Sequence, residues 1–449
     1  SDLPALIDVA FIDDTSTHGT QGVVGGSSGN EVANLTAVFT KRPVQTLSQT
    51  PTVQTTNQVA SANLLGAAAL VHEQSSGGTG GTGVTGGVTT QPPITTPPQV
   101  PTDPLAAIYQ GVTTVTQTQL PTQLNTLHPE PYASYITVGL ESGLHVIDSV
   151  MNRGLAGHHN TRGAIANETG SGSIEWIDAS GVSGDVEGSS DLGNYHYGID
   201  NVTLGASFVV TDDSELGFFM SFGEYDLDEH DIAAQTLSSK TLSAGLYTRK
   251  YLGNWSVDGL LGYSHGSHRS SREVIFGQVT GDAYSRYNSA SWLASTRVAY
   301  RFELASSFSL SPSLGLNYQH YRQSSFSERG EERLTMYVEE ATAESWITSA
   351  GLTAEIGPWS AFKPLLMVRY EYDWSAGADN NHEIFAGLNA NPGVSEGFVG
   401  QSRGSEAWVY GVGFASSPVA GFQMTGGVIW SDTENGEEIG GGLSASFAF

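Results

Sequence analysis

One short motif in this sequence has the residue types of a hydrolase nucleophile. Gly262-Tyr-Ser264-His-Gly266 matches the G-x-S-x-G pattern, in which a serine hydroxyl attacks a carbonyl carbon. That chemistry requires the serine on a sharp turn from a strand into a helix, whereas this copy lies inside a predicted strand. We therefore expect no catalytic residue here and no enzyme activity.

Histidine is the other residue type that could do chemistry. His158 and His159, with His145 upstream, could ligate a metal ion, but such residues are more often solvated side chains of a loop or lumen. Gly25–Gly29 lacks the following Lys-Ser/Thr and helix of a phosphate-binding loop. The chain has no cysteine, which excludes disulfides and thiolate metal sites. We expect no metal site and no cofactor.

The charge balance excludes another class of function. Lys and Arg number 18 against 46 Asp and Glu, so the net charge is −28 with histidine neutral. Nucleic-acid binding needs a basic footprint, and we expect no nucleic-acid partner. Many of the carboxylates, including Asp226, Glu328 and Glu331, fall in or beside predicted loops, where we expect them to be solvated.

Alternation of apolar and polar residues dominates the second half of the chain. Because successive side chains of a strand point to opposite faces, residues 291–304 would have one apolar and one polar face. Residues 361–374 repeat the pattern, with Leu365 and Met367 as exceptions on the polar face. The first apolar face comprises Trp292, Ala294, Thr296, Val298, Tyr300, Phe302 and Leu304.

Two all-β architectures could use such strands. A soluble sandwich buries its apolar faces against each other, whereas a transmembrane barrel turns them to lipid and lines its lumen with polar residues. Aromatic residues gather at the predicted strand ends, as in an interfacial girdle, and the sequence closes on the strand-like Leu443–Phe449. These features favour the barrel.

The predicted strands are even in number. Most odd-numbered connections between them are long, including 269–283 and the longest at 375–403, whereas the even-numbered ones are tight turns. Short turns on the periplasmic side are typical of outer-membrane barrels. With an even number of strands, the first strand begins and the last strand ends on that same periplasmic side. The predicted strands lie near residues 173–181, 195–210, 215–226, 239–251, 254–268, 284–304, 307–322, 343–356, 360–374, 404–416, 419–432 and 437–449. The predicted fold class is an all-β membrane barrel, a 12-stranded antiparallel transmembrane β-barrel with an N-terminal helix threading the lumen.

The chain divides into four predicted regions. Residues 1–50 would be a passenger tail or surface segment, and 51–130 a linker with helical pieces (54–72 and 105–127) and Gly- and Pro-rich low-complexity stretches. Residues 131–160 would form a pore helix, and 173–449 the barrel.

Residues 131–154 keep apolar side chains at helical spacing, with a polar side opposite. Gly139 and Gly143 reduce its intrinsic helix stability by about 1 kcal/mol each, so we expect a surrounding surface, the barrel lumen, to order it. The helix residues expected to meet the lumen are Tyr135, Glu141, His145, Asp148, Asn152 and Arg153. The charged residues expected on the lumen wall are Arg249, Arg297, Arg301, Lys363, Arg369 and Glu371. Two interpretations of these wall charges stay open: they pair with each other, or they form ion pairs with Glu141 and Asp148 of the helix.

Several segments carry a family resemblance. Leu127-His-Pro-Glu-Pro-Tyr-Ala-Ser134 resembles the start of the translocator of monomeric autotransporters, a type V secretion family. The Trp strand at Ile174–Trp176 and the strand at Tyr197–Val210 are similar to those that follow in the family. Terminal Phe449, with Phe447 and Leu443 on one face, resembles the signal read by the barrel assembly machinery.

The resemblance implies a function and partners. A twelve-stranded barrel threaded by a helix would export and anchor an N-terminal passenger on the surface of a Gram-negative bacterium. The implied partners are outer-membrane lipid and lipopolysaccharide, the barrel assembly machinery and periplasmic chaperones, with possible surface-assembly proteins. Asn152-Arg153 departs from the Asn-Asn pair at which some relatives cut themselves. Two alternatives stay open: an outer-membrane structural anchor whose N-terminal arm holds a surface assembly, and a diffusion pore or barrel-embedded hydrolase.

Overall fold

The computed structural model describes most of the chain. The residues described are 4–13, 35–76, 101–153, 173–189, 192–211, 213–229, 231–232, 234–305, 307–357, 362–377 and 382–448. Predictions that concern His158, His159, Gly25–Gly29, the low-complexity stretch at 77–100 and Phe449 lie outside them.

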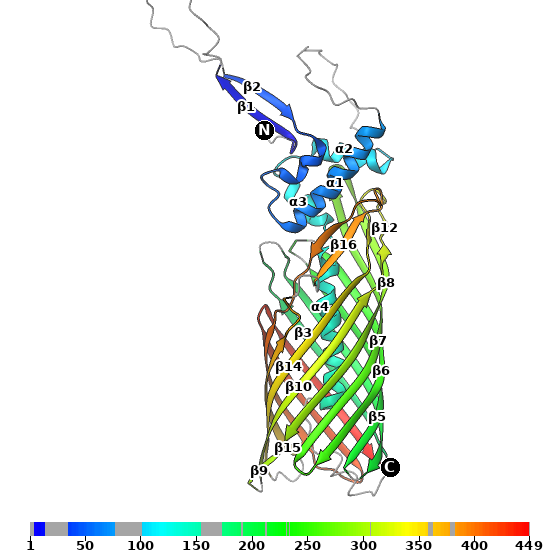
Figure 1. Ribbon diagram of the computed structural model, residues 1–449, viewed down its shortest axis with the longest axis vertical. Coiled ribbons are helices and arrows are strands. Elements are labelled where there is room, and N and C mark those ends of the chain that lie inside the picture. The colour runs from blue at the N-terminus through cyan, green and yellow to red at the C-terminus, as the bar shows by residue number, and fades with distance from the viewer. Residues whose placement is uncertain are drawn as a thin grey trace, which may run out of the picture.

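Twelve long antiparallel strands form a closed barrel (Figure 1). Each strand pairs with the next around the ring, β20 pairs with β3, and β8 pairs with β10, so the sheet has no open edge. The strands are β3 (Ser173–Val186), β4 (Tyr195–Thr211), β5 (Ser214–Glu229), β6 (Gln235–Leu252), β7 (Trp255–Phe276), β8 (Val279–Tyr300), β10 (Phe308–Gln323), β14 (Ala341–Ile356), β15 (Phe362–Asp373), β18 (Glu406–Ser416), β19 (Phe422–Thr433) and β20 (Gly436–Ala448). The expected fold class is confirmed.

The two ends of the barrel differ. We call the end with the tight β4–β5 and β6–β7 turns and the last described residues the base, and the opposite end the mouth. A short strand, β9 (Phe302–Ala305), continues the wall at the base and pairs with β10. At the mouth, β12 (Arg329–Gly330) pairs with β8.

One predicted connection at the mouth is wrong. The region expected as a long loop at 269–283 is a continuation of β7 and β8, which pair as far as Phe276 and Val279. Gly277 turns the chain there with a φ of +62°, a conformation that only glycine adopts at low cost. Toward the mouth, the outward residues of β7 and β8 are mostly polar and not apolar. The alternation of apolar and polar residues therefore ends before the strands do, and the sequence pattern did not predict their full length.

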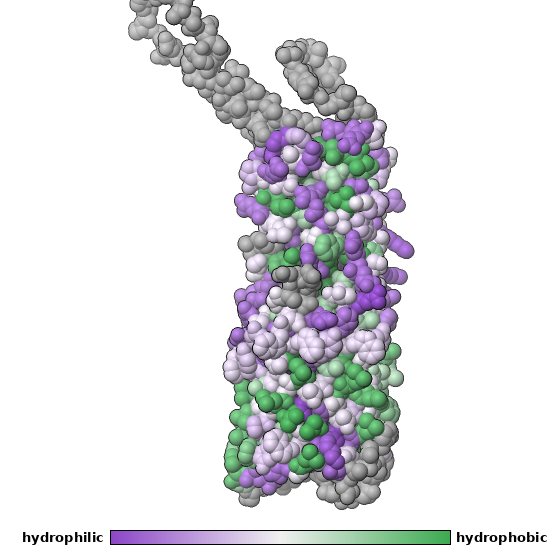
Figure 2. Space-filling view, in the orientation of Figure 1, coloured by the Kyte–Doolittle hydropathy of each residue, from purple (hydrophilic) through white to green (hydrophobic). Residues whose placement is uncertain are grey.

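The alternation distributes side chains as expected. Leu314 and Leu366 are 68% and 44% exposed on the outer surface, whereas Ser309 is 5% exposed on the inner face. Figure 2 shows hydrophobic colours concentrated on the wall toward the base and hydrophilic colours above them. An apolar outer belt of this kind is what lipid contact requires.

Aromatic pairs flank the apolar belt. The ring pairs near the base are Trp255–Tyr300, Phe362–Phe414 and Phe422–Phe447. The ring pairs nearer the mouth, which we call the mouth-side girdle, are Tyr263–Trp292, Tyr318–Trp346, Tyr370–Trp408 and Tyr410–Trp430. Amphipathic rings at these two levels mark the boundaries between lipid and water.

Two connections at the mouth build a small sheet, which we call the loop sheet. It has four strands in the order β11-β13-β16-β17. Their bounds are β11 (Phe326–Ser327), β13 (Met336–Val338), β16 (Glu383–Leu388) and β17 (Glu396–Val399). The long connection at 375–403 is therefore largely ordered.

Helices cover the mouth above the loop sheet (Figure 1). We call this group the helical cap; it shares one buried apolar cluster that includes Leu47, Leu64, Ile108 and Leu124. Its elements are the 3₁₀ helix η2 (Val44–Gln49), α1 (Thr56–Ser75), α2 (Pro104–Thr114) and α3 (Leu120–Leu127). No helix in the described ranges has both the length and the apolar character needed to span a membrane.

Local sequence explains where the cap helices begin. Thr55 and Gln58 form a reciprocal capping box at the start of α1, and Asp103 caps α2, which starts with Pro104. The single helical piece expected at 105–127 is two helices. Val115 is extended after α2, and Pro121 occupies the first turn of α3, where its missing N–H costs nothing.

The hairpin β1 (Ile7–Asp13) and β2 (Leu35–Lys41) precedes the cap. From the cap, the chain enters the barrel as α4 (Glu130–Asn152), which Figure 1 shows running from the mouth toward the base inside the ring of strands.

Candidate functional site

The lumen and the helix inside it form the candidate functional site. Nearly every residue of α4 is buried. At the mouth, the Tyr132 hydroxyl lies 2.6 Å from the Ser270 hydroxyl of β7. At the base, Arg153 lies against Glu215, the second residue of β5. The helix therefore contacts the wall from one end of the barrel to the other.

The C-terminal end of α4 is held by cations. Arg249 and Arg297 donate hydrogen bonds of 3.0 and 2.8 Å to the Met151 carbonyl. Asp258 lies between them, 2.9 Å from Arg249 and 3.2 Å from Arg297. The last carbonyls of a helix carry partial negative charge, so these guanidiniums both satisfy a free acceptor and complement the helix dipole.

Arg153 ends the helix in the left-handed conformation, with a φ of +46°. Its guanidinium donates to Glu215 over 2.6 Å and lies 5.1 and 5.3 Å from the ring centres of Trp176 and Tyr247. Thr425 of β19 donates to the Arg153 carbonyl. A non-glycine residue in this conformation is costly, and these contacts hold it there.

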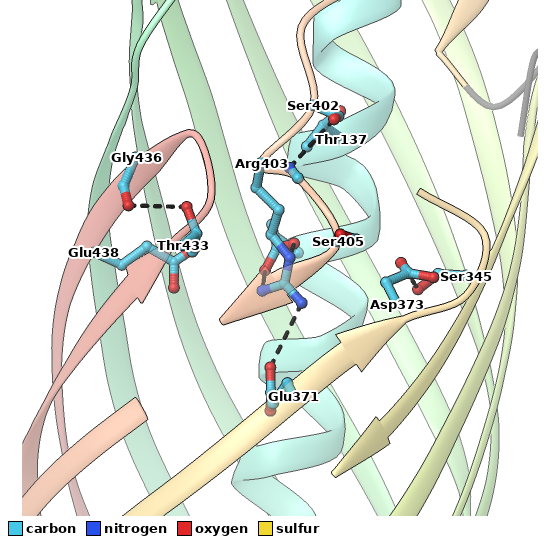
Figure 3. Close-up of polar contacts among 12 residues, drawn as sticks. Thr137, Ser345, Glu371, Asp373, Ser402, Arg403, Ser405, Thr433, Gly436 and Glu438 are labelled. Atoms are coloured by element: carbon cyan, nitrogen blue, oxygen red, sulfur yellow. Dashed lines mark hydrogen bonds and ion pairs between the residues drawn. The ribbon is translucent and has the colours of Figure 1, made fainter. Parts of the chain in front are cut away.

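A chain of charges crosses the middle of the lumen. Glu141 of α4 lies 2.8 Å from Arg403, which lies 3.5 Å from Glu371 of β15. Glu371 lies 2.8 Å from Arg369, and Arg369 lies 2.8 Å from Asp148 of α4. Figure 3 shows Arg403 reaching from its loop beside α4 toward Glu371. Wall residues thus pair with each other and with the helix, so both modes left open by the sequence coexist.

Tyr135 anchors the apolar side of α4 near the mouth. Its hydroxyl donates to the Tyr225 carbonyl over 3.0 Å and lies 2.8 Å from the Ser239 hydroxyl. Its ring meets the imidazole of His268 edge-on at 5.7 Å. Tyr321 completes this buried group. Buried tyrosines that find hydrogen-bond partners fix a helix in rotation as well as in depth.

Two glycines let α4 approach the wall. A Cβ at Gly139 would lie 2.7 Å from the ring of Tyr321 and 3.3 Å from the hydroxyl of Tyr225. A Cβ at Gly143 would contact the side-chain oxygen of Gln319 and lie 3.0 Å from Leu293. The residues that weaken the isolated helix are therefore the ones that allow it to pack against β10.

A buried ion pair joins the cap to the barrel. Arg272 of β7 makes two hydrogen bonds of 2.8 Å to Glu328, and both side chains are 0% exposed. Arg272 also donates to the carbonyls of Thr126 and Leu127 at the end of α3, 2.8 Å each. The Tyr132 hydroxyl donates to Glu328 over 2.9 Å. Glu328, expected to be solvated, is buried because a guanidinium from a strand 56 residues away in sequence neutralises it.

Burial changes the ionisation of groups beside this pair. Burial, with the nearby charge of Arg272, lowers the pKa of His128 to about 3, so the imidazole is neutral. Burial raises the pKa of Glu130 to about 8, although Ser134 donates to its carboxylate. The Ser134 hydroxyl also accepts a 2.8 Å hydrogen bond from the backbone N–H of Gln401, which lies in the long connection.

Two other helix residues were expected at the site, and Asn152 links the chain of charges to the group at the end of α4. Asn152 donates to Asp148 over 3.2 Å and accepts from Arg297 over 2.5 Å. Within the described residues, Nε2 of His145 has no hydrogen-bond partner.

Two expected lumen cations lie near the base. Arg301 forms two 2.9 Å hydrogen bonds with Glu355, and Lys363 is exposed at the start of β15. Of the expected assembly signal, Leu443 and Phe447 are 47% and 39% exposed on the outer surface.

The nucleophile-like motif lies within β7, as expected. Ser264 accepts a hydrogen bond of 2.9 Å from Ser243 on the neighbouring strand, and the adjacent His265 is exposed on the opposite face. In the described part of the chain, His, Asp and Glu form no group of three or more that could hold a metal ion.

Arg403 and Arg272 were not singled out from the sequence, and Glu328 was expected to be solvated rather than to belong to the site. Arg403 and Glu328 fall in segments predicted as loops, where charged residues are normally solvated. The only signal that could have found Arg272 is the alternation of β7. Arg272 has the same inward orientation as Ser270 and His268 on that strand.

A closed twelve-stranded barrel with an apolar belt between aromatic pairs and a helix in a polar lumen defines a membrane-spanning translocator-type barrel. A family model described as the autotransporter β-domain matches residues 176–428, more than half of the chain. The chain belongs to the autotransporter β-domain family. The expected family and an outer-membrane translocator role are thereby supported by fold and sequence together.

Solved structures share this fold at low sequence identity. The translocator domain of the autotransporter NalP from Neisseria meningitidis superposes with a TM-score of 0.55 and 12% identity, covering 71% of this chain and 100% of that one. The transport unit of the autotransporter AIDA-I from Escherichia coli has a TM-score of 0.47 and 14% identity, covering 69% and 99%. No curated protein sequence matches the chain.

Proposed function

We propose that this protein exports an N-terminal passenger through the outer membrane, anchors it at the cell surface, and retains α4 in the pore as a plug. The path of the chain carries the proposal. Residues before Asn152 run from the mouth to the base, and the first barrel strand then starts at Ser173 near the base. A segment that leads to the outside through its own barrel is the geometry expected of a transported chain.

The fit of α4 supports its role as a plug. Beside the helix, where it faces β10, β14 and β15, a cavity of about 40 Å³ remains. At about 10–15 Å³ for each water, that space holds roughly three molecules. A twelve-stranded barrel lies between types filled by side chains and porins with open channels, so one helix should occupy most of its lumen.

The orientation follows from the two ends. Outer-membrane barrels have short turns on the periplasmic side and long connections outside. The tight turns lie at the base, whereas the loop sheet and the helical cap lie at the mouth. We therefore place the mouth, with the N-terminal segment, at the cell surface of a Gram-negative bacterium.

A disulfide can test whether α4 sits in the pore. The Ser149 hydroxyl of α4 lies 3.0 Å from the Ser180 hydroxyl of β3. The chain has no cysteine, so Ser149→Cys with Ser180→Cys should form a single disulfide in the assembled protein. The matched control pairs Ser149→Cys with Ala179→Cys, because Ala179 is exposed on the outer face of the same strand.

Conductance in planar bilayers then tests the plug. We expect low conductance from the full chain and from the disulfide-linked variant, and a much larger conductance after deletion of residues 1–160. Equal conductance of full and deleted forms, or equal disulfide yield from the control pair, would contradict the proposal.

A second candidate function is a structural anchor that retains its N-terminal segment at the surface. The Asn57 side chain of α1 exchanges two 3.0 Å hydrogen bonds with the backbone of Val399 on β17. An amide that pairs with a strand edge in this way attaches the cap to the loop sheet. Persistence of residues 35–130 on intact cells, measured with antibody, would favour the anchor; release into the medium would count against it.

A further inference from the structure

Basic side chains gather on the outer wall of the barrel between the mouth-side girdle and the mouth. This is unexpected in a chain with 18 Lys and Arg against 46 Asp and Glu. We call the group the basic patch; its members, all exposed on neighbouring strands β6, β7, β8 and β10, are Lys240, His265, Arg269, Arg286 and Arg322.

Two members of the basic patch face each other directly. Arg269 of β7 and Arg286 of β8 are a cross-strand pair. Like charges at such positions, about 4.5–5.5 Å apart at Cβ, destabilise a sheet. Lys240 lies 2.8 Å from Glu224, and Arg322 lies 2.6 Å from Glu340.

By contrast, the structure as described gives the guanidiniums of Arg269 and Arg286 neither an ion pair nor a hydrogen bond. Two adjacent guanidiniums without an anion make a site at which an external anion would relieve repulsion and gain charge-assisted hydrogen bonds.

The height of this pair above the membrane limits the ligand. Tyr263 and Trp292, with ring centres 5.1 Å apart, belong to the mouth-side girdle. Arg269 and Arg286 each lie six residues beyond these rings on the same strands. At a rise of about 3.3 Å per residue and a tilt of about 40°, six residues reach about 15 Å above the girdle. Ordinary lipid headgroups extend only about 5–8 Å beyond the hydrocarbon.

We propose that the basic patch binds lipopolysaccharide through the anionic groups of its inner core sugars. Arg269 and Arg286 share one phosphate or carboxylate, because planar guanidiniums bind such groups through paired N–H donors. Lys240, two residues above the exposed Leu242, lies lower and meets anions nearer the glucosamine headgroup. The inference rests on the orientation proposed above, with the mouth outside.

The test compares two double variants of the full chain in detergent micelles. Arg269→Gln with Arg286→Gln removes two charges from the basic patch. Lys250→Gln with Lys363→Gln removes one half-buried and one exposed charge near the base and serves as the matched control. The probes are fluorescent lipopolysaccharide that retains its phosphorylated inner core, and lipid A that lacks core sugars.

We expect the arginine variant to bind core-bearing lipopolysaccharide about tenfold more weakly, with a shallower salt dependence, and the control to bind normally. Binding of lipid A should change little. Without glycolipid, the arginine variant should be at least as heat-stable as the wild type, because repulsion between the two guanidiniums is relieved.

Unchanged affinity of the arginine variant, or an equal loss in the control, would overturn the proposal. An equal loss for lipid A would also overturn it, because the anion would then lie at the headgroup. These measurements involve no transport, so their failure would leave the translocator proposal standing, and a failure of transport would leave them unaffected.

Discussion

Substitution of Gly139 by alanine should act in opposite directions on the isolated helix and on the assembled protein. In a free helix, alanine is about 1 kcal/mol more favourable than glycine. In the barrel, the added Cβ would lie 2.7 Å from Cε2 and 3.1 Å from Cζ of the Tyr321 ring. Tyr321 and Tyr225 are 1% and 2% exposed, so neither ring can move toward solvent.

The magnitude follows from these two terms. Overpacking of a closed core costs about 1–3 kcal/mol, and an approach this close to a confined ring belongs at the upper end. After subtraction of the helix gain, seating of α4 should weaken by about 1–2 kcal/mol. Since 1.4 kcal/mol is tenfold, the unseated population should rise roughly 5- to 30-fold. Gly143→Ala should cost less, because the end of the flexible Gln319 side chain can move aside.

Two assays read these effects. Circular dichroism of a peptide covering residues 130–153 should show higher helicity for Gly139→Ala than for wild type. Single-channel recordings of the assembled protein should show more frequent open events for the same variant, and fewer for Gly143→Ala than for Gly139→Ala. If Gly139→Ala reduced opening, helix propensity would dominate over packing, and the assigned role of this glycine would be wrong.

Three further predictions concern the wall, the cap and pH. Leu314→Arg, on the lipid face, should destabilise the barrel by about 2–4 kcal/mol in urea unfolding, whereas Ser313→Arg, on the lumen face, should be tolerated far better. Arg272→Met should cost about 3–5 kcal/mol because it leaves Glu328 charged and buried, and adding Glu328→Gln should restore part of the loss. Because the pKa of Glu130 is raised to about 8 in the folded protein from its usual 4.5, the folded state holds one more proton between these values. The contribution of Glu130 to stability should therefore fall with rising pH from about 4.5 to 8, by up to about 1.4 kcal/mol per pH unit. Because the lowered pKa of the buried His128 gives the opposite slope below about 6.5, the net fall should be measured between about 6.5 and 8, where Glu130→Gln should remove it.

The candidate site could be predicted in part. Arg249, Arg297, Arg369 and Glu371 were expected on the inner face because strand alternation assigns a face from local sequence alone. Asp148 was expected to meet a wall arginine because the helix had to find order inside a polar lumen. Which arginine it meets depends on the depth and rotation of α4, which the sequence pattern leaves free.

The residues that were missed share a physical reason. Arg403 lies in a connection with no periodic pattern, and its contact with Glu141 joins residues 262 apart in sequence. The pairing of Arg272 with Glu328 likewise forms only after the loop sheet folds over the mouth. The helical pieces of the cap were recognisable, but their burial was not, because their apolar faces are short and separated by low-complexity sequence.

The sequence alone thus determined the number of barrel strands, the side of the wall that each residue faces, and the helix that precedes the barrel. These properties depend on periods of two and about 3.6 residues, which short-range sequence expresses directly. The tertiary structure alone decided how far β7 and β8 extend, how the mouth is covered, and which charges meet inside. Those outcomes depend on contacts between segments that are distant in sequence. A charged group is buried there only because a partner of opposite charge compensates for the lost water, and a glycine leaves the space that a ring from another segment occupies.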